Sequence, residues 1–302
     1  MGYDPQKVID FYKLNAEKMA PLYQARSPIG TRKEIPFEGH KPVRVIVNYP
    51  RRTIGNDLYP VYINVHGGAF AEGDAVTMDS FCQKVADELG ILVINLNYRL
   101  FPEAYFPYPV QELDAVYRYV KENVVKLKID TSRIAAGGFS AGATIVFGHE
   151  VSLIQKGEEG YKCILGGYPM TSGRHEDVDN DSEYAAATNE LSAAMDLAMG
   201  KWIDNSMCSS LHASNEIIQK IKGAVIVFCG KDSLGKMGRD FALRLVSNGV
   251  PCFVREFRNA YHGFIEVNRP DYFMPDERKT EEQLKYCKEA EQFLINGLSV
   301  LL

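Results

Sequence analysis

The chain has 302 residues, a formal net charge of -5 at pH 7 and hydrophobic side chains at 46% of its positions. This length and composition suit one large α/β domain with a sizeable core, and the intermixed charges exclude the basic surface typical of proteins that bind nucleic acid or anionic membranes. No apolar run approaches the roughly 20 residues of a membrane span, and residues 1–7 show no secretion signal, so we expect a cytoplasmic protein whose ligand is a small molecule.

An amphipathic helix is expected over residues 4–18, at the start of the chain. Two strands, at 31–37 and 43–49, follow on either side of a glycine-containing turn, which predicts an antiparallel pair at a sheet edge. A further strand at 61–65 ends on a glycine-rich loop. The first part of the chain therefore supplies one edge of a sheet and leads into its centre.

Beyond residue 70, apolar strands alternate with helices. Strands are expected over 91–96, 163–168, 224–229 and 252–257, and one more in the apolar run that follows a turn at 130–134. Helices are expected over 78–89, 110–127, 241–246 and 280–294. Continuous apolar strands separated by helices predict a mostly parallel sheet covered on both faces.

Residues 170–215 interrupt this alternation. The segment is polar and acidic at first and becomes helical around 191–203, with no strand pattern. We interpret it as an insertion above the carboxyl edge of the sheet. Together with the N-terminal helix it would form a small helical cap, from about residues 1–28 and 171–215, on a single domain that spans residues 1–302.

The sequence Gly138-Phe139-Ser140-Ala141-Gly142 fits the G-x-S-x-G pattern of a nucleophile elbow, between an apolar strand and a helix. A serine on such a tight turn has a strained backbone, and its neighbours two positions before and after must be very small. The helix that begins at the serine directs unpaired N–H groups and the positive end of its dipole toward any oxyanion formed there. Because the pattern is short, it indicates a catalytic serine only if the other residues of a catalytic site occur elsewhere in the chain.

Three such partners follow the ends of other predicted strands. The loop that begins at His66 and Gly67 exposes successive backbone N–H groups, as an oxyanion hole requires. Asp232 follows the strand at 224–229, and His262 lies just past the strand at 252–257. The chain order Ser140, Asp232, His262 is the order that a serine hydrolase of α/β architecture uses.

With these motifs the sequence resembles the hormone-sensitive-lipase-like branch of the α/β-hydrolases. Residues 97–103 are similar to a Y-R-L-A-P-E segment of that family, and residues 130–143 to its D-x-S-R-I-x-x-x-G-x-S-A-G-G segment. The resemblance implies the α/β-hydrolase fold, with Ser140 as nucleophile, Asp232 as acid and His262 as base. It also assigns the oxyanion hole to the N–H groups of Gly68, Ala69 and Ala141, with His66, Gly67, Gly138 and Gly142 as supporting motif residues.

Five positions depart from the family pattern. Ala69 stands for the third glycine of H-G-G-G, Phe139 for the aspartate before the serine, and Ala143 for a glycine. Gly235-Lys236 replaces acidic residues after D-x-L. None of these changes removes a catalytic atom, so they bear on substrate range more than on activity.

The resemblance implies a carboxylesterase that cleaves esters of short to medium acyl chains through an acyl-enzyme, without a cofactor. Neither the physiological ester nor the formation of a homo-oligomer is readable from the sequence. Two alternatives remain: a peptidase or amidase on the same fold, whose members usually carry a large extra domain, and a non-catalytic ligand-binding protein of this fold.

Three weaker patterns compete with this hypothesis. Residues 230–236 fit G-x-x-x-x-G-K, but Met237 stands where a phosphate-binding loop needs Ser or Thr. Residues 177–183 imitate the start of a calcium loop but lack its glycine. The six cysteines include no C-x-x-C pair, and the pair Cys208 and His212 lacks zinc-site spacing, so we expect free thiols and no metal.

Overall fold

The computed structural model describes residues 3–52, 58–179 and 181–302. Eight strands form one sheet in the order β1-β2-β4-β3-β5-β6-β7-β8, in which β2 pairs antiparallel with β1 and β4 and every other pair of neighbours is parallel. The strands are β1 Thr31–Ile35, β2 Val43–Asn48, β3 Tyr59–Val65, β4 Leu92–Asn97, β5 Ile129–Phe139, β6 Ile164–Gly167, β7 Ala224–Lys231 and β8 Cys252–Tyr261. The predicted sheet, with an antiparallel pair at one edge, is confirmed.

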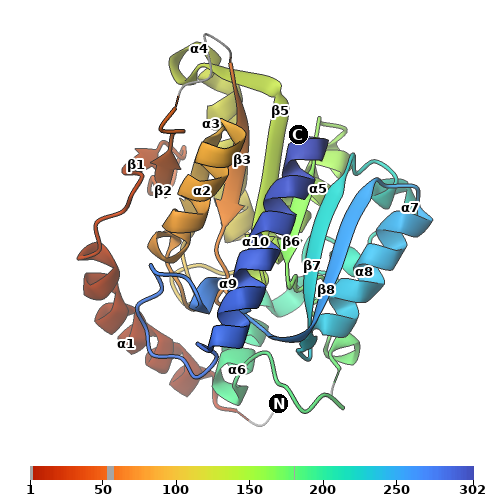
Figure 1. Cartoon of the computed structure of the whole chain (residues 1–302). Helices are drawn as coiled ribbons and strands as arrows, with labels where there is room; N and C mark the ends of the chain where they lie inside the picture. Colours follow the sequence, from red (N-terminus) through yellow and green to blue (C-terminus); the bar gives the residue numbers. More distant parts are fainter. Residues whose placement is uncertain (1–2, 53–57, 180) are drawn as a thin grey trace.

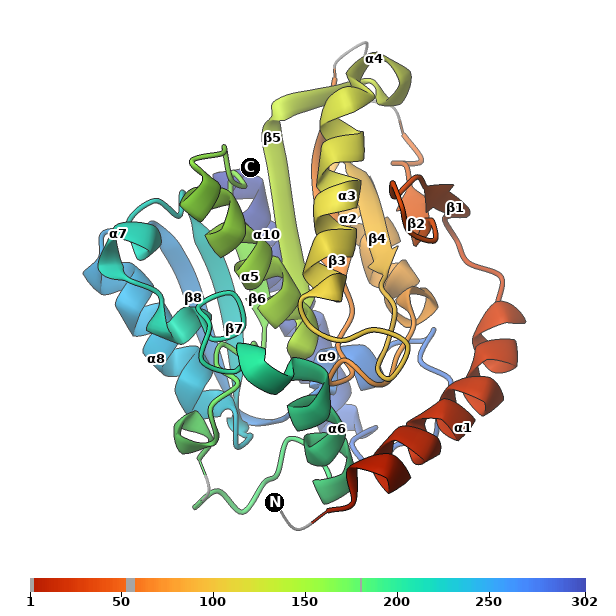
Figure 2. The same cartoon turned by 180° about the vertical axis from the view of Figure 1, so that it is seen from behind.

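Helices cover both faces of this sheet (Figures 1 and 2). One apolar cluster packs α2, α9 and α10 against one face, and the other packs α3, α5 and α8 against the opposite face. The helices are α1 Pro5–Gln24, α2 Asp79–Leu89, α3 Tyr108–Glu122, α4 Val124–Leu127, α5 Ala141–Lys156, α6 Asn189–Met199, α7 Asn215–Ile218, α8 Gly235–Ser247, α9 Phe264–Val267 and α10 Glu281–Leu301. Because both faces are covered, residues 61–65 of β3 are all buried rather than alternating.

Several predicted boundaries were wrong. The helix expected over 110–127 is two helices, because Asn123 leaves the helical conformation and its side-chain amide donates to the Tyr119 carbonyl at 2.9 Å. The turn expected at 130–134 lies within β5, where the pairing with β3 shifts register. Both terminal helices are longer than predicted, and α1 continues through Pro21.

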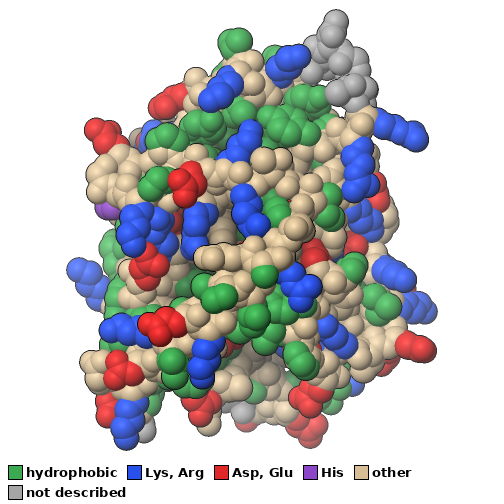
Figure 3. All heavy atoms as spheres, turned by 90° about the vertical axis from the view of Figure 1, so that its left-hand side faces the viewer, with side chains coloured by type: hydrophobic (Ala, Val, Ile, Leu, Met, Phe, Trp, Pro, Cys, Tyr) green, Lys and Arg blue, Asp and Glu red, His purple; other side chains and the backbone are tan. Residues whose placement is uncertain are grey.

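Helix α1 packs against α6 at the end of the molecule where β5 finishes (Figures 1 and 2). The two segments that we expect to form a cap therefore meet in the structure. None of the helices in the described part of the chain has the length and apolar character that crossing a bilayer requires. Basic and acidic side chains are interspersed over the face shown in Figure 3, as the composition indicates.

Candidate active site

Ser140 stands on a sharp turn between β5 and α5. Its backbone angles, φ 51° and ψ -121°, are strained for a residue with a side chain. A Cβ atom on Gly138 would lie 2.2 Å from the Gly142 carbonyl carbon, and one on Gly142 would lie 2.4 Å from the carbonyl oxygens of Val65 and His66. Only glycine fits at these two positions, as the G-x-S-x-G pattern predicted.

The structure brings the three predicted side chains together at the carboxyl ends of β5, β7 and β8. The Ser140 hydroxyl lies 2.8 Å from Nε2 of His262, and Nδ1 of His262 lies 2.8 Å from Oδ2 of Asp232. Oδ1 of Asp232 accepts the backbone N–H of Leu234 at 2.9 Å, which fixes the carboxylate plane. The Asp232 side chain is 1% exposed and that of His262 is 11% exposed, so the carboxylate is screened from solvent behind the ring.

The loop after β3 holds its peptide groups in fixed orientations. The Gly67 carbonyl accepts the hydroxyl of Tyr98 at 3.1 Å and lies 2.7 Å from Nδ1 of His66. The Gly68 carbonyl accepts the N–H groups of Ala71 and Glu72 at 2.9 and 2.8 Å. Because a trans peptide places its C=O and N–H on opposite sides, these bonds direct the N–H groups of Gly68 and Ala69 away from their anchors.

Those two N–H groups and that of Ala141 donate to no acceptor among the residues that the structure describes. Ala141 is the first residue of α5, where a helix leaves its N–H groups without an internal partner. The predicted oxyanion donors are therefore free in the structure, which is the condition for stabilising a negative oxygen. Ala69 adopts φ 51°, a left-handed conformation that the family glycine would adopt without strain.

The buried ring of His66 supports the loop after β3. The ring is 1% exposed and stacks on Tyr98 with 4.4 Å between centroids. Burial lowers the pKa of His66, which favours the neutral ring. Since a carbonyl only accepts hydrogen bonds, the Nδ1 atom facing the Gly67 oxygen carries the proton.

Sequence reasoning missed the groups that hold the base and the loop in place. The Arg278 guanidinium donates to the His262 carbonyl at 2.7 Å, and its own position is fixed by Asp276. The Glu266 carboxylate accepts the N–H of Gly67 at 2.8 Å. Gly67 and Glu266 are 199 positions apart, so no local pattern could have joined them.

Phe139, which departs from the family pattern, is fully buried and packs against Phe81 and Tyr168.

Lys236 of the phosphate-loop-like segment pairs with Asp240 on the exposed surface of α8. In the calcium-loop-like segment, Asp177 bonds His212 at 2.6 Å, and residue 180 lies outside the described residues. Within residues 3–52, 58–179 and 181–302, no three potential metal-ligating side chains gather at one point.

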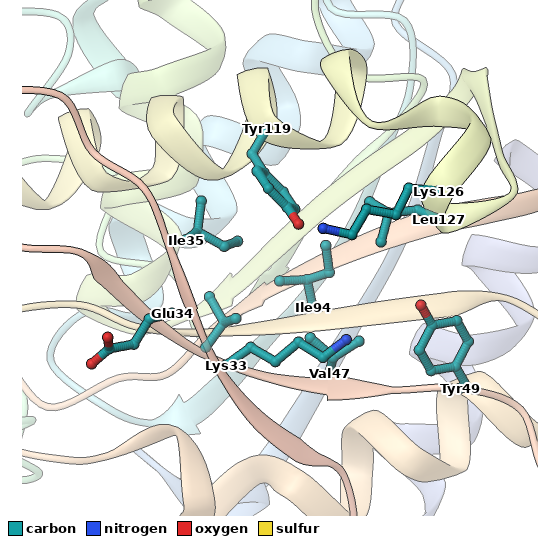
Figure 4. Close-up of a pocket in the computed structure, with 10 residues that line it drawn as sticks. Lys33, Glu34, Ile35, Val47, Tyr49, Ile94, Tyr119, Lys126 and Leu127 are labelled. Atoms are coloured by element: carbon teal, nitrogen blue, oxygen red, sulfur yellow. The ribbon is translucent and has the colours of Figure 1, made fainter.

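A cavity of about 420 Å³ lies between the β1–β2–β4 edge of the sheet and helices α3 and α4 (Figure 4). Its lining is mostly apolar, with Lys33 and Lys126 among its polar residues, and Lys126 extends toward the hydroxyl of Tyr119. None of the lining residues belongs to the predicted site, so the cavity has no part in the arrangement above.

Comparison with known proteins gives the same fold. The family profile for the α/β-hydrolase fold matches residues 62–266. The esterase LipI of Mycobacterium tuberculosis is 26% identical over 250 residues, 75% of this chain and 76% of its own, and an arylesterase of Saccharolobus solfataricus is 25% identical over 87% of this chain and 89% of its own. A solved esterase from Pyrobaculum calidifontis has a TM-score of 0.73 at 22% identity, over 97% of this chain and 94% of its own.

The matched region extends from β3 to α9 and includes every predicted site residue. The chain therefore belongs to the α/β-hydrolase fold family. Within that family it belongs to the hormone-sensitive-lipase-like branch, which the motifs around His66, Tyr98 and Ser140 predicted.

Proposed function

We propose that this chain is a serine carboxylesterase, with Ser140 as nucleophile, His262 as base and Asp232 as the acid that orients the base. The observation that carries the proposal is the line of hydrogen bonds from Ser140 through His262 to Asp232, each 2.8 Å long, beside three free N–H groups. The esterase names of relatives that cover three quarters or more of this chain support the same reaction.

In the first half of the reaction, Nε2 of His262 takes the Ser140 proton as the oxygen attacks the ester carbonyl. Asp232 keeps the other nitrogen protonated and stabilises the positive ring. The tetrahedral oxyanion is held by the N–H groups of Gly68, Ala69 and Ala141. His262 then donates its proton to the departing alcohol, and a water molecule repeats the sequence on the acyl-enzyme.

The cap, about residues 1–28 and 171–215, would limit the space available to the acyl or alcohol group, because α1 and α6 lie beyond the edge of the sheet that carries the triad. We therefore propose short to medium acyl chains as substrates. A peptidase or amidase would use the same triad, and the two alternatives differ in how fast an amide of the same acyl group is cleaved.

The proposal is tested with a series of p-nitrophenyl esters from acetate to decanoate and with the matching anilides. Ser140→Ala is expected to lower kcat by roughly 10⁶-fold, the loss seen when a triad nucleophile is removed. Ser152→Ala, on helix α5, which begins directly after Ser140, is the matched control and should keep wild-type rates. Ester hydrolysis that survives Ser140→Ala would refute the assignment, and anilides cleaved as fast as esters would favour the amidase.

The pH profile gives an independent check. The base must be neutral to accept the serine proton, so kcat/KM is expected to be lower in acid than at neutral pH. Equal rates in acid and at neutral pH would contradict a histidine base.

A further inference from the structure

Glu266 places a carboxylate between the loop after β3, which carries the proposed oxyanion donors, and the segment that carries the proposed base His262. Oε1 accepts the N–H of Gly67 at 2.8 Å, and Oε2 accepts the hydroxyl of Tyr168 at 3.2 Å. The Tyr168 hydroxyl in turn accepts the backbone N–H of Glu266 at 3.2 Å. Glu266 thus joins the loop after β3, the end of β6 and helix α9, three segments that are distant in the sequence.

This carboxylate has no cationic partner within ion-pair distance in the described part of the chain. Burial raises the pKa of Glu266 above its ordinary value, while the Gly67 N–H and the nearby His262 and Arg278 oppose that shift. An unpaired carboxylate in such surroundings costs free energy unless its oxygens are hydrogen-bonded. Here both oxygens accept hydrogen bonds, and one of the donors, Gly67, belongs to the loop after β3, residues 66–69, which is the proposed oxyanion loop.

We propose that Glu266 is a positioning residue that fixes the oxyanion loop relative to the base. The inference rests on the proposed function. Glu266 follows His262 by four residues, so one short segment carries both the base and the acceptor that holds the first peptide of the loop. The next two peptides of the loop are held through the carbonyls of Gly67 and Gly68, and their N–H groups are the proposed oxyanion donors.

Space at Gly67 supports the same role. A Cβ atom on Gly67 would lie 2.7 Å from Oε2 of Glu266 and 3.1 Å from the Phe139 carbonyl. The loop therefore packs directly on the Glu266 carboxylate, with no room for a side chain between them. A shift of the Gly67 N–H would also move the Gly67 Cα, because the two belong to one planar peptide unit, and that Cα carries the next peptide, whose N–H is the Gly68 donor.

Tyr168 couples the carboxylate to the base from a second direction. Its ring packs edge-on against the His262 ring, with 5.1 Å between centroids, while its hydroxyl bonds Glu266. Removing that hydroxyl leaves the ring contact with His262 but releases one oxygen of the carboxylate. Tyr168→Phe is therefore a second perturbation of the same network that keeps the packing of the aromatic core.

The experiment compares Glu266→Gln, Tyr168→Phe and the double variant with the wild type. Glu266→Gln keeps an oxygen that can accept from Gly67 but loses the charge, so we expect kcat to fall about tenfold with KM changed less than about twofold. The affinity for an aryl trifluoromethyl ketone, whose adduct places an oxyanion in the loop, should fall by the same factor as kcat/KM. The double variant should lose less than the product of the two single losses, because both residues act through one carboxylate.

Glu150→Gln is the matched control. Glu150 is also a buried carboxylate that accepts a backbone N–H, from Tyr161 at 2.9 Å, but it lies in the second half of α5, beyond the end that carries Ser140. It should keep the wild-type kcat and ketone affinity. Thermal unfolding of every variant, together with the final stoichiometry of labelling by a phosphonate ester, measures the fraction of folded protein with a reactive serine.

The inference is overturned if Glu266→Gln keeps kcat within twofold of the wild type, if its loss lies in KM alone, or if the loss of activity follows the loss of folded protein. Multiplicative losses in the double variant would also overturn it, since they would show two independent effects. A wild type that cleaves no ester would instead refute the proposed function, so the two failures are distinguishable.

Discussion

Replacing Glu150 with glutamine should change how the stability of the protein depends on pH. Glu150 lies on α5, is 1% exposed and accepts one hydrogen bond from the residues that the structure describes, from the N–H of Tyr161. Burial raises the pKa of Glu150 from 4.5 to about 7, against the opposing effects of that N–H and of Lys222. The folded protein therefore holds this proton at pH values where the unfolded chain has already released it.

The sign follows from proton linkage. A carboxyl whose pKa is raised by folding contributes its full stability below pH 4.5, and that contribution is lost as the pH rises toward 7. With pKa values of 4.5 unfolded and about 7 folded, the loss between pH 5 and pH 8 is about 2.5 kcal/mol. Glutamine does not titrate, so the variant lacks this part of the pH dependence.

The assay is urea unfolding of the wild type and Glu150→Gln at pH 5 and pH 8, with the free energies of unfolding compared as a double difference. Any cost of packing the new amide is the same at both pH values and cancels. From pH 5 to pH 8, we expect the free energy of unfolding of the variant to increase by about 2.5 kcal/mol relative to that of the wild type. A double difference below about 0.5 kcal/mol would show that Glu150 is ionised in the folded protein at neutral pH and would refute the reasoning.

Three further predictions concern the proposed active site. Gly142→Ala should lower kcat/KM by at least about 100-fold, because the alanine Cβ would force the serine turn away from the carbonyls of Val65 and His66. Stopped-flow labelling of Ser140 by a phosphonate would measure the loss of reactivity. Asp232→Asn should lower kcat by roughly 10⁴-fold with the fold intact, since an amide favours the wrong imidazole tautomer; unchanged kcat in steady-state assays would contradict the triad. Tyr98→Phe removes the hydroxyl that holds the Gly67 carbonyl and should lower kcat about tenfold with little change in KM, and a loss confined to KM would argue against this role.

Periodicity and strand ends were sufficient to predict most of this architecture. The buried strands are continuous apolar runs, and a glycine pattern marks each place where the backbone must approach another segment, as at Gly138 and Gly142. Since the carboxyl ends of parallel strands share one edge, residues that follow β5, β7 and β8 had to lie near each other. This is why Ser140, Asp232 and His262 could be placed together from sequence order alone.

Element ends and long-range polar pairs could not be predicted in the same way. Helix α1 continues past Pro21, although proline lacks the N–H that an internal helical position uses, and propensity alone predicts an earlier end. Asn123 divides one predicted helix into two through a bond to the turn before it. The hydrogen bond between Glu266 and Gly67 depends on where two distant segments meet, and their residue types give no sign of the pairing.

The oxyanion loop shows why so much polar structure surrounds a few free N–H groups. An N–H group stabilises a developing oxyanion most when it does not have to reorient during the reaction. The peptide of Gly68 is held through the Gly67 carbonyl by Tyr98 and His66, and the peptide of Ala69 is held through the Gly68 carbonyl by the next turn of the chain. The anchors bond the carbonyl side of each peptide, so the donors on the opposite side remain both oriented and unoccupied. Weakening a single anchor should therefore reduce the rate of the chemical step while leaving the binding of the uncharged ester nearly unchanged.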